Sequence, residues 1–264
     1  MGRSRRWGRH WRRAGLTLRG LTAAVGVWAL VAHYLDRPLL LPGPAEVTEG
    51  FWALLVSGRL VEETLVSLRR LAVAYTAAAI VGVTLGAAMG AWRSVDRLVS
   101  PLVNSVRAVS GIAWIPIAVI WFGVSELLPI FIIFYGAVFP FALNAQLGVR
   151  SVDSRLVHAA RSLGASHGRV ALRVVLPATV PYLLTGARVA LGLAWMSIIA
   201  AELLGAPTGL GFSIQYARML QQTPRMLAWI LWVGAVGYAL DAAMRMGVRW
   251  LAPWTGVGRL AGAA

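Results

Sequence analysis

The sequence contains no cysteine and no lysine, and its acidic residues are few. Without cysteine, the chain forms no disulfide bond and offers no thiolate to a metal ion. Without lysine, it lacks the P-loop lysine that contacts nucleotide phosphates, so it does not carry a standard nucleotide site of its own. No nucleophile–base set is apparent, and no metal-ligand spacing links the histidines, which are His10, His33, His158 and His167. The sequence therefore predicts neither a catalytic residue nor a metal site.

Charged residues make up only 13% of the 264 residues, whereas 58% are hydrophobic and the mean hydropathy is +0.70. These values are far from those of a soluble domain and predict a polytopic membrane protein. All 25 basic residues are arginine, and the formal net charge is +15. In a soluble protein such a charge indicates nucleic-acid binding, but in a membrane protein its distribution between loops indicates topology. No nucleic-acid partner is therefore expected.

The long apolar segments predict an all-α polytopic membrane helix bundle with about six transmembrane helices. Spans of about 20 residues match a hydrocarbon core of about 30 Å. The predicted helices occupy residues 21–35, 67–92, 106–124, 127–147, 181–204 and 227–247. Pro116 lies in the middle of the third helix and is expected to bend it, because proline removes one backbone hydrogen bond. We expect a basic tail over residues 1–20 and a single transmembrane domain over residues 21–264.

The distribution of arginine predicts which segments face the cytoplasm. Eighteen arginines fall in the N-terminal tail, a loop over residues 93–107, a loop over residues 150–173 and the C-terminal segment, and only four fall in the opposite loops. Because cytoplasmic loops carry the excess of basic residues, both termini are predicted to be cytoplasmic. Residues 38–63, with a short amphipathic helix around residues 47–56, and residues 205–225 are expected as outer connections.

Small residues recur at every fourth position of the predicted second helix. They are Ala74, Ala78, Gly82, Gly86 and Gly90. Such a stripe permits close approach of a neighbouring helix, since association in lipid is driven by packing and not by hydrophobic exclusion. We expect this stripe to be a helix-packing surface, and Gly186, Ala190 and Ala194 form a similar face on the fifth helix.

Few polar residues lie within the predicted spans, and four of them are candidates for the translocation pathway: Arg69, Arg70, Asn144 and Glu202. Two interpretations remain for each. The arginines either extend to the membrane interface or face a water-filled vestibule that attracts anions. Asn144, together with Gln146, either lines the pathway or forms hydrogen bonds across helices, and we favour the hydrogen bonds. Glu202 is either functional or reaches interfacial water.

The loop over residues 150–178 is an arginine-bearing interruption between two apolar runs. Apolar residues at helical spacing follow Asp153 or Ser154, either of which can cap the first free backbone N–H groups. Gly164 is expected to end this helix, and a second short helix is expected over residues 166–176. The sequence therefore predicts two short helices hinged at a glycine.

This loop resembles the cytoplasmic EAA loop of bacterial ABC-importer permeases, in which Glu-Ala-Ala, a glycine and a Leu-Pro pair recur at fixed spacing. The corresponding positions here are His158, Ala159, Ala160, Gly164, Val174, Leu176 and Pro177, so the spacing is kept and only the glutamate is missing. The resemblance implies a coupling helix, including Arg161, that docks into a groove on an ATPase subunit. The alternative interpretation is an amphipathic loop lying on the membrane surface.

Other stretches extend the resemblance over most of the chain, from residue 41 to about residue 254. SLRR from Ser67, IAWIPIAVIWFG over residues 112–123 and ALGLAWMSIIAAELL over residues 190–204 are most similar to the nitrate/sulfonate/taurine branch of these permeases. GLGFSIQYAR over residues 209–218 resembles the stretch that links the last two core helices. The resemblance implies the type I ABC-importer permease (MetI-like) architecture.

The resemblance also implies a transport subunit and not an enzyme. Such a permease would move a small anion, such as an aliphatic sulfonate, taurine or nitrate, across the bacterial cytoplasmic (inner) membrane. Its implied partners are two ATPase subunits, an extracytoplasmic substrate-binding protein and a second copy of the permease. The chain itself is expected to bind no cofactor, since ATP and Mg²⁺ belong to the ATPase.

Two alternatives remain for the function. A thiamine-precursor pyrimidine or another small solute is an alternative substrate for the same machinery. A secondary carrier or channel is an alternative class of protein, but it requires charged residues at mid-membrane, and this sequence has almost none there.

Overall fold

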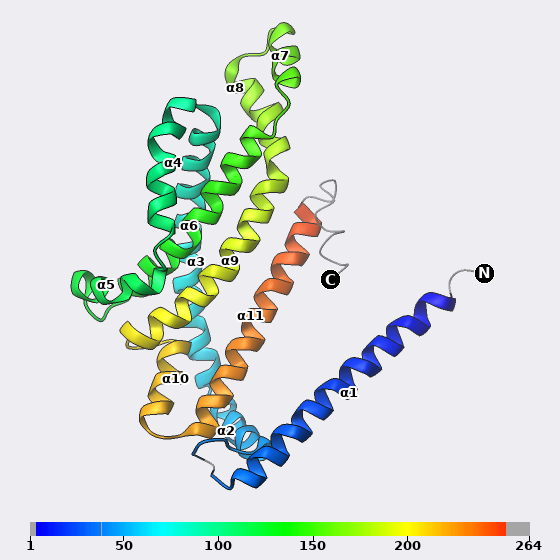
Figure 1. Cartoon of the computed structure of the whole chain (residues 1–264), viewed down its shortest axis with the longest axis vertical. Coiled ribbons are helices and arrows are strands. Elements are labelled where there is room, and N and C mark those ends of the chain that lie inside the picture. The colour runs from blue at the N-terminus through cyan, green and yellow to red at the C-terminus, as the bar shows by residue number, and fades with distance from the viewer. Residues whose placement is uncertain (1–3, 38, 252–264) are drawn as a thin grey trace. The chain divides into compact units, whose positions relative to one another are not determined.

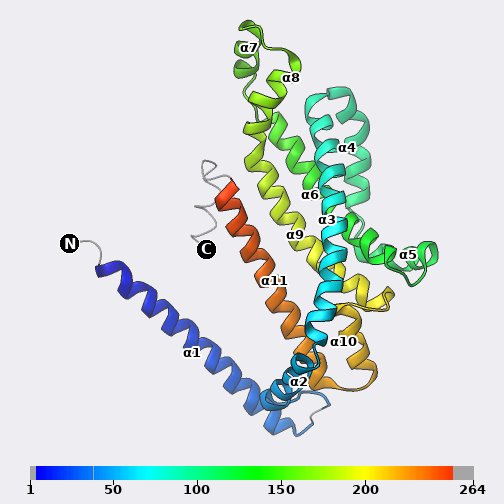
Figure 2. The ribbon, with the colours of Figure 1, turned by 180° about the vertical axis from the view of Figure 1, so that it is seen from behind.

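The computed structural model describes residues 4–37 and 39–251, and all regular secondary structure in these residues is helical. Figures 1 and 2 show the helices of the chain, which divides into two compact units. The first comprises Met1–Val61 and Ile214–Trp232, and the second comprises Glu62–Ser213 and Val233–Ala264.

The first unit contains α1 (Ser4–Leu35), α2 (Pro44–Val56) and the parts of longer helices that fall within its bounds. The predicted short helix around residues 47–56 is present as α2. Its first turn is favoured by a proline at the start and by the Gly43 N–H, which donates to the Glu46 carboxylate at 3.1 Å. The indole N–H of Trp28 donates to the Pro42 carbonyl at 3.1 Å and so joins α1 to the loop before α2.

The second unit is built around two antiparallel helices, α6 (Leu127–Arg150) and α9 (Leu176–Gly205), which lie side by side in both views (Figures 1 and 2). The helix α3 (Arg59–Ala91) packs on α6 through its part in this unit. The core between these helices consists of small and branched apolar side chains that are almost fully buried: Leu71, Ala74, Ala78, Ile133, Ala137, Val138, Phe141, Ala190, Ala194 and Ile198.

Glycines in the small-residue stripe allow α3 to approach α6 closely. A Cβ atom built on Gly82 would lie 2.6 Å from the Phe141 Cβ, and one on Gly90 would lie 2.7 Å from the Val149 Cβ. At Gly86, the obstacle to a Cβ atom is the backbone of Ala142 itself. The three glycines of the predicted packing surface thus lie against α6. The two alanines of the same stripe, Ala74 and Ala78, are fully buried in the core.

Among the described residues, four helical runs are long and apolar enough to cross a membrane: Arg59–Ala91, Leu127–Arg150, His167–Gly205 and Thr223–Trp250. The pair Arg93–Arg107 and Gly111–Phe122 counts as a fifth span if it is taken as one broken helix, and Thr22–Leu35 is a shorter apolar helix. The prediction of an all-α polytopic membrane bundle is therefore confirmed.

The predicted third transmembrane helix, over residues 106–124, is wrong as a single helix. Instead, α4 (Arg93–Arg107) occupies the stretch expected as a loop, and the chain then bends by 83° into η1 (Gly111–Trp114) and α5 (Ile115–Phe122). Pro116 lies in the first turn of α5 and not in the middle of a helix. Proline is tolerated at this place because the N–H groups in the first turn of a helix have no partner within the helix, so no hydrogen bond is lost.

Two further connections differ from the sequence prediction. The expected outer connection over residues 205–225 contains a helix, α10 (Leu210–Met219). The short helix expected to end at residue 176 instead continues into the membrane helix, as α8 (His167–Val170), a π-helical turn η2 (Ala171–Val175) and α9. Pro177 stands in the first turn of α9, directly after the π-helical turn.

Candidate functional site

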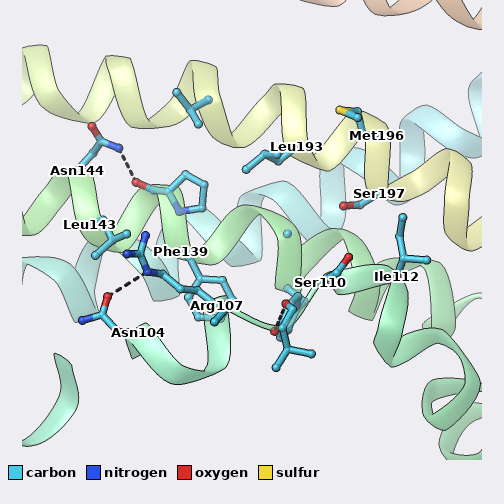
Figure 3. A pocket seen from close by; sticks show the side chains of 17 residues that line it. Asn104, Arg107, Ser110, Ile112, Phe139, Leu143, Asn144, Leu193, Met196 and Ser197 are labelled. Carbon is cyan, nitrogen blue, oxygen red and sulfur yellow. Dashed lines mark hydrogen bonds between the residues drawn. The ribbon is translucent and has the colours of Figure 1, made fainter. Parts of the chain in front are cut away.

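A cavity of about 730 Å³ lies in the second unit, where the broken helix α4–η1 meets α6 and α9 (Figure 3). Its walls are partly apolar, with Phe139 and Leu143 from α6 and Leu193 and Met196 from α9. The chain bends by 83° after α4, and residues on both sides of this bend, Asn104 and Arg107 of α4 and Gly111 and Ile112 of η1, line the space. The volume is in the range of small-molecule sites.

The end of α4 is held in place by Tyr135 of α6. Its hydroxyl lies in hydrogen-bonding distance of two carbonyls, those of Val106 and Val109. Val106 lies in the last turn of α4, where its carbonyl also accepts the Val109 N–H at 3.1 Å, and Val109 follows the helix. Tyr135 therefore satisfies the broken end and fixes one wall of the cavity.

Arg107 is the single cation in the described lining of the cavity, and no carboxylate belongs to that lining. Its Nε–H donates to the side-chain oxygen of Asn104 at 3.0 Å, and in the described part of the chain it has no carboxylate partner. Figure 3 shows the Arg107 and Asn104 side chains together on one side, with the hydroxyl of Ser197 on another wall. The cavity thus combines one positive charge with neutral polar groups.

Of the four predicted pathway residues, Asn144 lines this cavity. Its amide donates to the Pro140 carbonyl at 2.9 Å, one turn earlier on its own helix (Figure 3). Gln146 does form the predicted hydrogen bond across helices, to the carboxylate of Asp96 on α4. Arg107 and Asn104 were missed by the sequence analysis, because they were assigned to a loop and lie at a helix end.

Arg69, Arg70 and Glu202 lie away from that cavity, in a cluster of charges that joins α3, the α5–α6 turn, α9 and the loop before α10. The Arg70 guanidinium is fully buried and donates to the carboxylates of Glu126, at 2.9 Å from Nε, and Glu202, at 2.8 Å from Nη1. It also donates to the carbonyl and hydroxyl oxygens of Thr208, each at 2.7 Å. Neither predicted position for Arg70, the interface or an open vestibule, matches this burial. Arg69 remains 68% exposed beside Glu126.

The Glu202 carboxylate is fully buried and accepts from groups on two other segments. The Ser67 hydroxyl lies 2.8 and 2.9 Å from its two oxygens, and the Gly211 N–H donates to it at 3.0 Å. Glu202 therefore does not reach interfacial water. Gly209, which has a positive φ of +108°, donates its N–H to Glu63 at 2.6 Å, so the loop is tied to α3 as well. The pathway roles of Arg69, Arg70 and Glu202 stay a prediction.

Glu126 lies between α5 and α6, outside the membrane-spanning segments. Hydrogen bonding from the Arg70 guanidinium holds the pKa of Glu126 below its usual range, and Arg69 acts in the same direction. The carboxylate is therefore ionised at neutral pH.

The predicted coupling loop forms α7 (Ser154–Ser162), a turn at Gly164 and α8. Asp153 caps α7 by accepting the Arg155 N–H at 2.8 Å, and Ser166 caps α8 by accepting the Arg169 N–H at 3.4 Å. Gly164 has a φ of +79°, a conformation that favours glycine. The two short helices and their glycine hinge are confirmed, with the difference that the second continues into α9.

α7 lies beyond the ends of α6 and α9 in both views, and none of its residues is buried. His158, Ala159, Arg161 and Gly164 are exposed, and Ala160 is half-buried. Leu163, directly after α7, is 89% exposed. This projecting end thus presents an apolar side chain beside small residues. Their docking role remains a prediction, as does that of Leu176 and Pro177.

Comparison with known families identifies the chain's relatives. The sequence model of the family described as "Binding-protein-dependent transport system inner membrane component" matches residues 79–255. The taurine transport system permease protein TauC of Escherichia coli is 36% identical over 93% of this chain and 91% of its own length. The bicarbonate transport system permease protein CmpB of Synechococcus elongatus is 36% identical over 73% of this chain and 68% of its own length.

A solved structure supports the fold. The inward-facing MetNI methionine ABC transporter contains a chain that matches 70% of this chain and 95% of its own length, with a TM-score of 0.53 and 22% sequence identity. At that identity the match shows a shared fold and nothing about the substrate. The MetI-like architecture predicted from the sequence is therefore confirmed.

Proposed function

We propose, from the premise that this chain belongs to the family of binding-protein-dependent transport system inner membrane components, that it carries a small anion across the cytoplasmic membrane. The chain is a multi-pass inner-membrane permease of an ABC importer and is not itself catalytic. The anion is proposed to be an aliphatic sulfonate, nitrate or bicarbonate, and the zwitterion taurine, which also carries a sulfonate, is a further candidate substrate. A partner ATPase would bind and hydrolyse ATP with Mg²⁺.

The observation that supports an anion is the charge of the cavity between α4–η1, α6 and α9. Arg107 supplies one positive charge, and no carboxylate in the described lining opposes it. A guanidinium presents several N–H donors in one plane, which suits the oxygens of a sulfonate or carboxylate. Because Arg107 is exposed and the other polar groups are neutral, the contact would be weak enough to release the substrate.

The same charge distribution favours a net anion over a zwitterion. Taurine carries an ammonium group besides its sulfonate, and the described lining offers no carboxylate to pair with it. The apolar walls from Leu193 and Met196 suit a short alkyl chain. An aliphatic sulfonate therefore matches both features of the cavity.

The proposed assembly follows the family. Binding-protein-dependent transport requires an ATPase and an extracytoplasmic binding protein as partners. We infer two copies of the permease and two ATPase subunits, with α7 and its glycine hinge docked on each ATPase and both termini in the cytoplasm. Closure of the ATPases would then move the two α7 helices and shift the permease between inward-open and outward-open states.

Uptake by the reconstituted complex tests the proposal. The permease, its ATPase and its binding protein are placed in vesicles, and uptake of radiolabelled ethanesulfonate, taurine and bicarbonate is measured with and without ATP. We expect ATP-dependent uptake, with ethanesulfonate faster than taurine. Uptake driven by an ion gradient through this chain alone would instead identify a secondary carrier and overturn the proposal.

A further inference from the structure

A second cavity lies at the opposite end of α4 from the first, where α3 ends, α4 begins and α6 ends. It has a volume of about 430 Å³ and is lined by Gly90, Arg93, Asp96, Arg97 and Arg150. Three arginines and one aspartate thus surround a space at the junction of three helices. This cavity belongs neither to the predicted functional residues nor to the proposed transport pathway.

The aspartate in this cavity is already occupied by protein groups. Asp96 forms an ion pair with Arg150 at 2.6 Å and accepts a hydrogen bond from Ser100 at 2.6 Å and another from Gln146. Arg93 and Arg97, one helical turn apart on α4, have no carboxylate partner among the residues that the structure describes. The lining therefore holds two positive charges that no described acid neutralises.

The position of the cavity places it at the edge of the membrane. The apolar span of α3 ends at Ala91, and that of α6 ends at Arg150. Trp92, between Gly90 and Arg93, is 61% exposed, and tryptophan is enriched at the boundary between hydrocarbon and headgroups. The arginines thus lie at the depth where lipid phosphates lie.

Exposed apolar side chains continue from the arginines along α4. Leu98 is 73% exposed and Leu102 is 62% exposed, and their spacing of four residues places them on one face of the helix. Such a face beside a basic pocket offers contacts to an acyl chain as well as to a headgroup. A soluble phosphate would use the arginines alone.

We propose that this pocket binds the phosphate of an anionic phospholipid, such as phosphatidylglycerol. Arg93 and Arg97 hold the phosphate oxygens, Asp96 orients Arg150 toward the same space, and the acyl chains lie along Leu98 and Leu102. The bound lipid connects the end of α3, the start of α4 and the end of α6, and three residues separate the end of α6 from α7. Basic pockets between membrane helices are known to select acidic headgroups, at about fivefold in affinity per arginine.

Binding of phosphatidylglycerol to the purified full-length permease tests this proposal, with native mass spectrometry as the readout and phosphatidylcholine as the neutral comparison. The double variant Arg93→Gln/Arg97→Gln is expected to bind phosphatidylglycerol roughly 25-fold more weakly. The matched control is Arg169→Gln/Arg173→Gln, which removes the same charge outside the cavity and is expected to bind like the unmodified protein. Equal binding by the two double variants would overturn the proposal.

Two further arms separate charge from misfolding and lipid from soluble phosphate. Arg93→Lys/Arg97→Lys keeps both charges and is expected to retain most of the binding; a loss as large as that of the glutamine variant would show that positive charge does not drive the binding and would overturn the proposal. Inorganic phosphate in excess is expected not to displace the lipid. If it does displace phosphatidylglycerol, the pocket is a site for soluble phosphate and the lipid assignment is wrong.

Discussion

The guanidinium of Arg70 on α3 lies 2.8 Å from the carboxylate of Glu202 on α9, and both side chains are completely buried. Removing one member of a buried ion pair leaves the other charged and unpaired, which costs more than the pair itself contributes. The pair also binds the segment that joins α9 to α10. Arg70 donates to the carbonyl of Thr208, and Glu202 accepts the N–H of Gly211 at the start of α10. Loss of the pair should therefore affect both the stability of the fold and the loop between α9 and α10.

Arg70→Gln is expected to destabilise the permease by about 3–5 kcal/mol. The measurement is denaturant unfolding in detergent, followed by tryptophan fluorescence. Arg69→Gln is the matched control, because Arg69 is exposed and makes one contact to Glu126; its effect is expected to be below about 1 kcal/mol. Similar effects of the two variants would show that burial of the Arg70 network does not stabilise the fold.

Glu126 makes stability depend on acid pH. Its pKa is lowered by the hydrogen bond from Arg70, so its contribution is fully present above the unfolded pKa of about 4.3 and is lost as pH falls through the folded pKa. We expect the melting temperature to fall between neutral pH and about pH 3.5. Glu126→Gln should show a lower melting temperature at neutral pH and a weaker dependence on acid. An identical pH profile for both proteins would contradict this linkage.

Gly86→Ala is expected to destabilise the permease by about 1–3 kcal/mol, because the added Cβ meets the backbone of Ala142, which cannot move aside like a side chain. Gly86→Leu should prevent assembly. Gly192→Ala on α9 is the control, since nothing lies within 4 Å of its Cβ position, and alanine there should be neutral or slightly stabilising. Melting temperatures in detergent compare the variants, and equal values for the two alanine variants would exclude close packing at Gly86.

Arg107→Gln is expected to lower the initial rate of sulfonate uptake by about tenfold, since it removes the single charge in the described lining of the large cavity. Arg107→Lys should restore part of the rate because it restores the charge. Arg218→Gln on α10 removes an equal charge outside the cavity and serves as the control. Uptake is measured in vesicles with ATP and the binding protein, and an unchanged rate for Arg107→Gln would separate this cavity from the pathway.

Cysteines placed on α7 should crosslink to the ATPase. The chain has no native cysteine, so His158→Cys and Leu163→Cys each introduce one reactive thiol on the projecting end of the second unit. Leu163 is preferable to Gly164, whose positive φ would strain a cysteine. Leu98→Cys, exposed on α4, is the control. If Leu98→Cys crosslinks to the ATPase and neither His158→Cys nor Leu163→Cys does, α7 is not the helix that docks on the ATPase.

His158→Glu tests how the missing glutamate of the EAA pattern is compensated. It places a negative charge between Arg155 and Arg161, one helical turn to either side. A loss of substrate-stimulated ATP hydrolysis would indicate that the ATPase groove is acidic and adapted to a positive helix. Unchanged hydrolysis would indicate that docking depends on Ala159, Ala160 and the hinge.

Features that depend on neighbouring residues could be predicted from the sequence. The apolar runs around α6, α9 and α11 (Thr223–Leu251) indicated membrane helices, because the cost of burying backbone in lipid is met within each helix. The sequence narrowed the cap of α7 to Asp153 or Ser154 and placed the hinge at Gly164, since capping and a positive φ are decided within a few residues; the structure shows Asp153 as the cap. The stripe of small residues that ends at Gly90 could be recognised from the helical repeat alone, because its members recur at every fourth position.

Features that depend on distant residues were decided by the tertiary structure. Ser67 and Arg70 of α3 are far in the chain from Glu126 and from Glu202. Only the packing of α3 against α9 and the α5–α6 turn joins these polar residues in one network. The 83° break after Arg107 also arises from packing, because Tyr135 stabilises carbonyls that an unbroken helix would have used itself. Local hydropathy carries no information about such partners, and for that reason the large cavity and its arginine appear only in the folded chain.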